Sequence, residues 1–137
     1  MEPTSDRPSH AALAERNARE HAFFAEWAVH PEGDTMRWRR QLRLLRRARP
    51  GGLGDVLSLG CGRGEFELML AADAHHVVGV DLSTESIDDA RARCADAGAN
   101  NIEFVRADVV DFELDRTFDV VLCIGFLHHL SDAEGLA

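Results

Sequence analysis

The chain has 137 residues, which fits one domain able to bury roughly two thirds of the surface that its unfolded chain exposes. It is 45% hydrophobic and 28% charged, as globular proteins are, and has no apolar run of about 18 residues that could cross a bilayer. The net charge of −9 is uneven: residues 1–50 hold ten Arg against seven acidic side chains, and residues 51–137 hold five against seventeen. Because nucleic-acid readers usually present a basic face, the acidic charge of residues 51–137 argues against a nucleic-acid partner. We also expect no membrane partner, since no apolar run is long enough to cross a bilayer.

The first residues, "MEPTSDRPSHAAL", contain neither a basic leader nor the apolar stretch of a signal peptide. We therefore predict a disordered tail over residues 1–8 and a cytoplasmic location. The three cysteines are odd in number and lie far apart without a CxxC pair, which argues against a disulfide framework and a zinc site.

Two helices are predicted in residues 9–50. The segment 9–30 indicates one helix that buries its leucine and aromatic residues, and "MRWRRQLRLLRRARP" over 36–50 indicates a second that ends at Pro50 and Gly51. Trp38, Leu42 and Leu45 recur in it at helical spacing between arginines. A basic amphipathic helix can bind RNA or an anionic membrane, but a packed helix with a solvated Arg face is the favoured interpretation.

From residue 55 onward, short apolar runs alternate with helical patterns. Strands are predicted over 55–59, 77–81, 102–108 and 118–125, and helices over 65–74 and 85–97. Ser83 or Thr84 can cap the later helix, and Gly98 can close it. Continuous apolar strands that alternate with helices predict an α/β fold with an open parallel sheet covered on both faces.

The segment "VLSLGCGRGEF" places Gly60, Gly62 and Gly64 at the first strand-to-helix turn, beside which open α/β sheets bind their ligands. Asp81 ends the second strand, where an acid can accept hydrogen bonds from ribose hydroxyls. These residues predict a nucleoside-containing ligand. A dinucleotide would place its pyrophosphate near Glu65, which would repel it, whereas a sulfonium without phosphate would suit the acidic surroundings.

Four motifs in order, "VLSLGCGRG", "VVGVDLS", "FVRAD" and "FDVVLCIGFLHHL", resemble those of class I S-adenosylmethionine-dependent methyltransferases, especially the small-molecule enzymes. The resemblance runs from about Asp55 to Asp132. It implies a Rossmann-like fold over residues 51–137, preceded by the helices of residues 9–50 on the substrate side. It also implies S-adenosyl-L-methionine as cofactor and methyl transfer to a small-molecule acceptor.

The resemblance further implies a set of cofactor contacts. The three glycines would let the backbone approach the methionine portion, with Cys61 between them, and Asp81 and Leu82 would meet the ribose and the adenine. Asp108 would accept from the adenine amino group beside Val109, while Cys123 and Ile124 would offer backbone carbonyls to the methionine ammonium. Ser58 is a departure, because the family usually has Asp or Glu there on the ammonium side.

Other candidates are weaker. His128 and His129 could act as a general base, although neighbouring residues point in different directions. No metal site is expected from the histidines, since no spacing suited to ligands is present. Gly79 is interpreted as a site of close packing in its strand, and Asp119 as a residue at the start of a strand.

Two alternatives to methyl transfer remain: an aminopropyl transferase on the same fold, and a truncated or catalytically silent cofactor-binding module. The family sheet has seven strands and four are predicted here, while "SDAE" at 131–134 has the form of a capping box that begins another helix. We therefore expect a domain that is incomplete after the fourth strand. Its apolar edge would favour self-association or a complementing chain.

Overall fold

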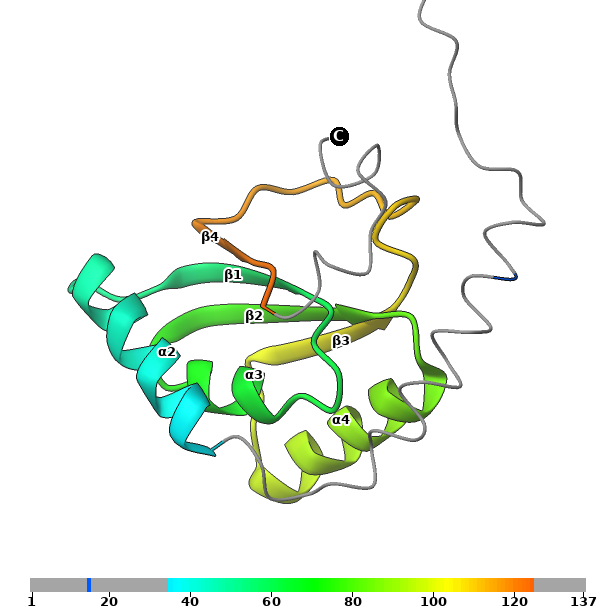
Figure 1. The fold of residues 1–137 in the computed structure, drawn as a ribbon, viewed down its shortest axis with the longest axis horizontal. Coiled ribbons are helices and arrows are strands. Elements are labelled where there is room, and N and C mark those ends of the chain that lie inside the picture. Colours follow the sequence, from blue (N-terminus) through cyan, green and yellow to red (C-terminus); the bar gives the residue numbers. More distant parts are fainter. Residues whose placement is uncertain (1–14, 16–34, 125–137) are drawn as a thin grey trace, which may run out of the picture. The chain divides into compact units, whose positions relative to one another are not determined.

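The computed structural model of the chain describes residue 15 and residues 35–124 (Figure 1). The chain divides into two units, residues 1–33 and 34–137, and every element named below belongs to the second. The predicted tail and, apart from the helical Glu15, the predicted first helix lie outside the described residues. So do residues 125–137, which include His128, His129 and the segment 131–134.

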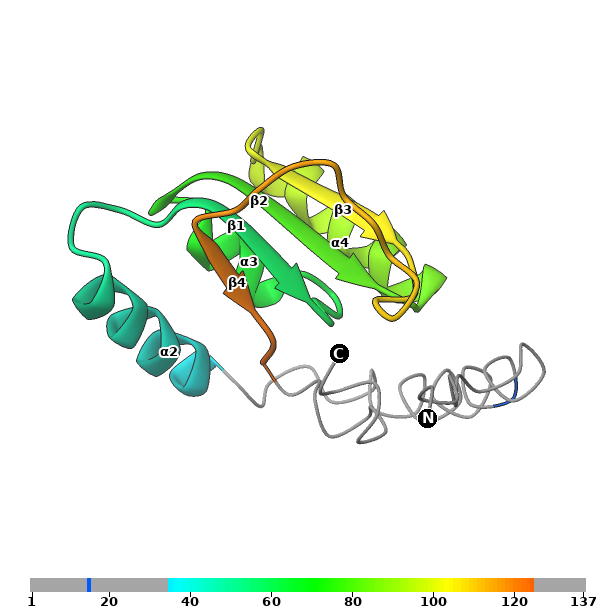
Figure 2. The ribbon, with the colours of Figure 1, turned by 90° about the horizontal axis from the view of Figure 1, so that it is seen from above.

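A four-stranded parallel sheet forms the centre of this unit. Its strands are β1 (Gly54–Leu59), β2 (Ala74–Asp81), β3 (Ile102–Arg106) and β4 (Val120–Leu122), in the order β3-β2-β1-β4. The predicted α/β class and Rossmann-like open parallel sheet are thereby confirmed. Because all four strands run the same way, their carboxyl ends meet along one edge of the sheet (Figure 2).

Helices α3 (Glu65–Leu70) and α4 (Thr84–Ala97) connect β1 to β2 and β2 to β3, and both lie against the same face of the sheet (Figures 1 and 2). The predicted ends of α4 are confirmed: the Ser83 hydroxyl accepts a hydrogen bond from the Ser86 amide at 3.2 Å, and Gly98 closes the helix at φ 67°. The described helices cover one face only. On the other face Val121, paired with Leu57 across β1 and β4, is 56% exposed.

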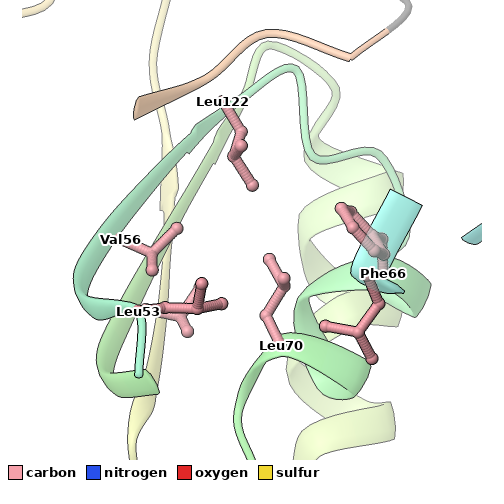
Figure 3. Close-up of a cluster of buried hydrophobic side chains, with 7 residues drawn as sticks. Leu53, Val56, Phe66, Leu70 and Leu122 are labelled. Atoms are coloured by element: carbon pink, nitrogen blue, oxygen red, sulfur yellow. The ribbon is translucent and has the colours of Figure 1, made fainter. Parts of the chain in front are cut away.

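Two apolar clusters join the helices to the sheet. The larger contains Leu42, Leu53, Val56, Phe66, Leu70, Val77 and Leu122, from α2 (Thr35–Ala48), α3, three strands and the residue before β1 (Figure 3). The smaller contains Ile87, Ala90, Cys94 and Phe104, from α4 and β3. Full burial of one such side chain stabilises the fold by about 1.5–3 kcal/mol, so these clusters fix α3 and α4 firmly beneath the strand ends.

Helix α2 (Thr35–Ala48) is a packed helix, as the favoured interpretation holds. Leu42 is buried, and the Trp38 ring stacks on Phe66 of α3 with centroids 5.0 Å apart. At its far end the Arg46 guanidinium donates to the Asp73 carboxylate, with Nη2 at 2.8 Å, and so ties α2 to the turn before β2. No helix in the described part of the chain has both the length and the apolar character needed to cross a bilayer.

Several predicted boundaries are wrong. Helix α3 ends at Leu70 instead of residue 74, and β2 begins at Ala74 instead of residue 77. The cause is the Asn101 side-chain amide, which donates to the carbonyls of Ala71 at 2.9 Å and of Ala74 at 3.2 Å. These bonds hold the chain in a turn between helix and strand. The strands β3 and β4 are also shorter than predicted, ending at Arg106 and Leu122.

Asp119 has the structural role expected of it. Its carboxylate accepts a hydrogen bond from the Asp55 amide at 2.8 Å, and its own amide donates to the Asp55 carbonyl at 2.8 Å. These bonds lie at the amino ends of β1 and β4, opposite the edge where the carboxyl ends meet. Asp119 therefore aligns the two strands and lies away from the candidate site.

Gly79 is a site of close packing in β2, as predicted, and the neighbour it packs against is Phe104. A Cβ at this position would lie 2.7 Å from Phe104 Cδ1 and 3.0 Å from Cys61 Sγ. We expect Gly79→Ala to lower the free energy of unfolding by about 1–3 kcal/mol, the usual cost of overpacking a core. Urea denaturation checks this. In a Phe104→Leu background, which shortens the opposing ring, the same substitution should cost less, and an equal cost in both backgrounds would contradict the steric explanation.

Candidate functional site

The three glycines of the first turn all adopt positive φ: 73° at Gly60, 55° at Gly62 and 75° at Gly64. This left-handed region is costly for residues with a Cβ, which explains why the turn needs glycine at alternate positions. The amides of Gly60 and Cys61 both donate to the Val80 carbonyl, at 2.8 and 3.0 Å. The turn therefore stays joined to β2 beyond the end of β1.

The glycines differ in what surrounds them. A Cβ on Gly64 would lie 2.6 Å from Phe104 Cζ and 3.0 Å from the Ala90 Cβ, so this glycine lets the turn pack on the core. A Cβ on Gly62 would meet nothing within 4 Å. Gly62 is therefore the position where the turn leaves open space next to the backbone, as close approach of a ligand requires.

Asp81, at the carboxyl end of β2, organises this space. Its Oδ2 accepts a hydrogen bond from the Gly62 amide at 2.8 Å, and its Oδ1 accepts one from the Ser83 amide at 2.9 Å. Each carboxylate oxygen has two lone pairs, so both remain able to accept a further bond. Asp81 thus holds the glycine turn and the start of α4 together and keeps capacity for hydroxyl donors.

The remaining predicted contacts within residues 35–124 follow the carboxyl ends of the strands. Leu82 follows β2, Asp108 and Val109 follow β3, and Cys123 and Ile124 follow β4; all five are partly buried. The Asp108 side chain accepts from the Val110 amide at 3.1 Å, which shapes the loop after β3. The parallel sheet therefore brings the ends of all four predicted segments to one edge.

The Cys61 side chain faces inward. Its Sγ lies against the space above Gly79 and contacts the cluster around Phe104. Burial is the main cause that raises the pKa of this thiol far above its ordinary value, and the charges of Glu67 and Asp81 raise it further. The thiol is thus a neutral packing group, and what Cys61 can offer to a ligand at the turn is its backbone.

Sequence reasoning missed Glu67, a buried carboxylate beneath the turn. Ser58 of β1 is buried and donates its hydroxyl to Glu67 Oε1 of α3 at 2.5 Å. Glu67 itself is only 2% exposed, and its Oε2 has no hydrogen-bond partner. The available signal was spacing, because Glu67 lies three residues before the fully buried Leu70 and so on the same helix face.

Burial raises the pKa of Glu67 to about 7, against the lowering effect of the Ser58 hydrogen bond. A carboxyl whose pKa is higher in the folded state than in the unfolded state stabilises the fold most at low pH. We expect the free energy of unfolding to fall by on the order of 2–3 kcal/mol as pH rises from the unfolded pKa of Glu67 through 7. Denaturation of Glu67→Gln, which has nothing to ionise there, should lack this component; the same slope in both proteins would contradict it.

Among the described residues no group of three His, Cys, Asp or Glu is placed to hold a metal ion. The carboxyl edge has instead an open glycine turn and the Asp81 carboxylate, with the buried Glu67, whose Oε2 has no hydrogen-bond partner, beneath the turn. The open turn and these acceptor oxygens fit S-adenosylmethionine, which carries ribose hydroxyls and positive charge. A pyrophosphate would meet acidic groups, so it fits the edge poorly.

The fold and the turn are those of a Rossmann-like domain, a class of domain in which nucleoside-containing ligands bind at the carboxyl edge of the sheet. The methyltransferase domain family model matches residues 56–137, more than half of the chain. The chain belongs to this family, which confirms its resemblance to class I S-adenosylmethionine-dependent methyltransferases.

Known proteins agree with this assignment. The chain is 32% identical over 81 residues to a probable (S)-tetrahydroprotoberberine N-methyltransferase 2 of Papaver bracteatum, covering 58% of this chain and 23% of that protein. It is 32% identical over 83 residues to a ubiquinone biosynthesis O-methyltransferase of Actinobacillus pleuropneumoniae, covering 56% of this chain and 35% of that protein. Among solved structures, a "DhpI-SAM-HEP complex" aligns with a TM-score of 0.68 and 27% identity over 95% of this chain and 58% of that one. The matched segments thus make up about a quarter to a third of these curated relatives' length.

Proposed function

We propose that the chain binds S-adenosyl-L-methionine at the carboxyl edge of the sheet and serves methyl transfer to a small-molecule acceptor. The observation that carries this proposal is the open, positive-φ Gly62 whose amide is held by Asp81. It supplies both backbone space and an acceptor for ribose at one point. The acidic surroundings support a cationic ligand over an anionic one.

Bound S-adenosylmethionine supplies a methyl group activated by a sulfonium. The chain's own residues bind and orient it. Asp81 would accept from the ribose hydroxyls, Leu82 and Val109 would border the adenine, and Asp108 would accept from the adenine amino group. Cys123 and Ile124 would offer backbone carbonyls to the methionine end. Holding reacting groups in line in this way is worth up to about 7–11 kcal/mol in model reactions, so no covalent catalyst is required.

A small-molecule acceptor is supported by the named N- and O-methyltransferase relatives, whose names refer to small organic compounds. His128 and His129 stay candidates for a general base. The cytoplasmic location also stays a prediction, as does self-association through the edge of β4. Val121 on the edge strand β4, with its 56% exposure, supports the last of these.

Calorimetry of the 137-residue chain with S-adenosylmethionine and with NAD, run side by side, tests the proposal. We expect heat of binding with S-adenosylmethionine alone, and methyl transfer from the labelled cofactor to amine or hydroxyl acceptors in a small-molecule panel. Binding of NAD alone would overturn the assignment of the ligand. Binding of S-adenosylmethionine without transfer to any acceptor would favour the catalytically silent module.

A further inference from the structure

Ser58 of β1 is uncharged, but its side chain contacts a buried carboxylate. The resemblance implies an acid at this position of β1, and a carboxylate does lie next to it, because Glu67 reaches from α3 to the Ser58 hydroxyl. A serine on the strand and a glutamate on the helix together place a carboxylate beneath the glycine turn.

Burying the Glu67 carboxylate in this position destabilises the fold. It is 2% exposed, and one of its oxygens has no hydrogen-bond partner. A buried polar atom left without a partner destabilises a fold, and a buried charge does so more strongly. Ser58 satisfies only Oε1, so packing alone gives no reason for an acid here.

The charges around Glu67 make a cation the fitting partner. The charged groups that act on it are Asp81 at the end of β2 and Glu65 on its own helix, and both are acidic. Glu65 lies 3.6 Å from Arg93, and Asp81 is engaged with the Gly62 and Ser83 amides. The titratable neighbours Cys61 and Cys94 are neutral thiols, since burial raises the pKa of each. A ligand with a positive group beneath the turn would therefore compensate a local excess of negative charge.

We propose that Glu67 is the carboxylate that holds the ammonium of the methionine portion of S-adenosylmethionine, directly or through a water, with Ser58 positioning it. This inference rests on the proposed function and assigns one of its contacts to a residue on α3. It explains why Ser58 is accepted on β1: its hydroxyl fixes Oε1 and leaves Oε2 for the ligand.

The test compares two ligands that differ at the relevant end. S-adenosylhomocysteine carries the amino-acid ammonium, and 5′-methylthioadenosine has the same nucleoside without it. For Glu67→Gln at pH 8 we expect affinity for S-adenosylhomocysteine to fall about 10- to 100-fold, the equivalent of one charge-assisted hydrogen bond. Affinity for 5′-methylthioadenosine should stay within about twofold of the wild type.

Matched variants separate this role from a structural one. Glu65→Gln changes an acid on the same helix that is 42% exposed, and it should leave both affinities unchanged. Ser58→Asp combined with Glu67→Gln returns a carboxylate to β1 and should recover part of the lost affinity. Thermal melts at pH 8 should show Glu67→Gln at least as stable as the wild type, because it no longer buries a charge.

A second readout is pH. Since the pKa of Glu67 is raised to about 7 by burial, its carboxylate forms as pH rises from 6 to 8. Wild-type affinity for S-adenosylhomocysteine should increase over this range, and that of Glu67→Gln should not. Affinity for 5′-methylthioadenosine should be flat in both proteins.

Three outcomes would overturn the inference. They are an unchanged affinity of Glu67→Gln for S-adenosylhomocysteine, an equal loss for both ligands, and a double variant as weak as Glu67→Gln. In each of these cases, the proposed function still holds as long as the wild type binds S-adenosylhomocysteine. If the wild type binds neither ligand, the proposed function itself fails, and the role of Glu67 fails with it.

Discussion

Gly62→Val should abolish measurable binding of S-adenosylmethionine while the domain stays folded. A side chain at this position would project into the open space beside Asp81, where the ligand is proposed to lie. The backbone at φ 55° also disfavours a β-branched residue, by about 1–2 kcal/mol or more. The side chain would exclude the ligand and the strained backbone would shift the amide of residue 62. We therefore expect affinity for S-adenosylmethionine to fall at least about 100-fold, measured by calorimetry.

Gly98→Val is the matched control. Gly98 has φ 67° and nothing within 4 Å of its would-be Cβ, but it closes α4 at the opposite end from the site. Both valine variants should lose comparable stability in urea denaturation, and Gly98→Val should retain wild-type affinity. Normal binding by Gly62→Val would mean that the glycine turn has only a structural purpose.

Asp81→Asn should lower affinity for S-adenosylmethionine by about 10- to 150-fold, which corresponds to the 1.5–3 kcal/mol of hydrogen bonds to a charged group. The asparagine keeps the volume of the side chain but replaces one acceptor oxygen with a donor. That donor would oppose either the Gly62 or the Ser83 amide, so part of the loss would come from a disturbed turn.

The ribose contact can be separated from this effect on the turn. The wild type should bind S-adenosylhomocysteine better than its 2′-deoxy analogue, and Asp81→Asn should lose that preference. Asp119→Asn, an acid at the amino ends of the strands, should lower stability without changing ligand affinity. A preference for the ribose hydroxyl that survives in Asp81→Asn would place the ribose elsewhere.

Local chemistry made much of the fold predictable. The strands that end near Gly60 and Asp81 are predictable because apolar runs end there in turn residues. The ends of α4 are predictable because Ser83 and Gly98 have strong capping preferences. The end of α3 could not be found in this way. It depends on the Asn101 side chain, which is 30 residues away from the carbonyl of Ala71 that it binds.

The candidate site was predictable in outline and not in its interior. A parallel sheet must bring its carboxyl ends together, so Asp81 and Asp108 could be assigned to one edge from sequence. Whether Cys61 faces the ligand or the core depends on the space that Gly79 leaves in the neighbouring strand. Glu67 is not apparent from the sequence, because a helical pattern of apolar residues gives no sign of an acid on the buried face.

The stacking of Trp38 on Phe66 gives the domain an optical reporter. The two rings lie with their planes 19° apart, and Phe66 is the residue directly before Glu67 on α3. Indole emission responds to small changes in the distance and orientation of its neighbours. With Trp27, the other tryptophan of the chain, replaced by Phe, the emission of Trp38 should follow any shift of α3 as a ligand is titrated. Movement beneath the glycine turn can thus be followed in solution without an added label.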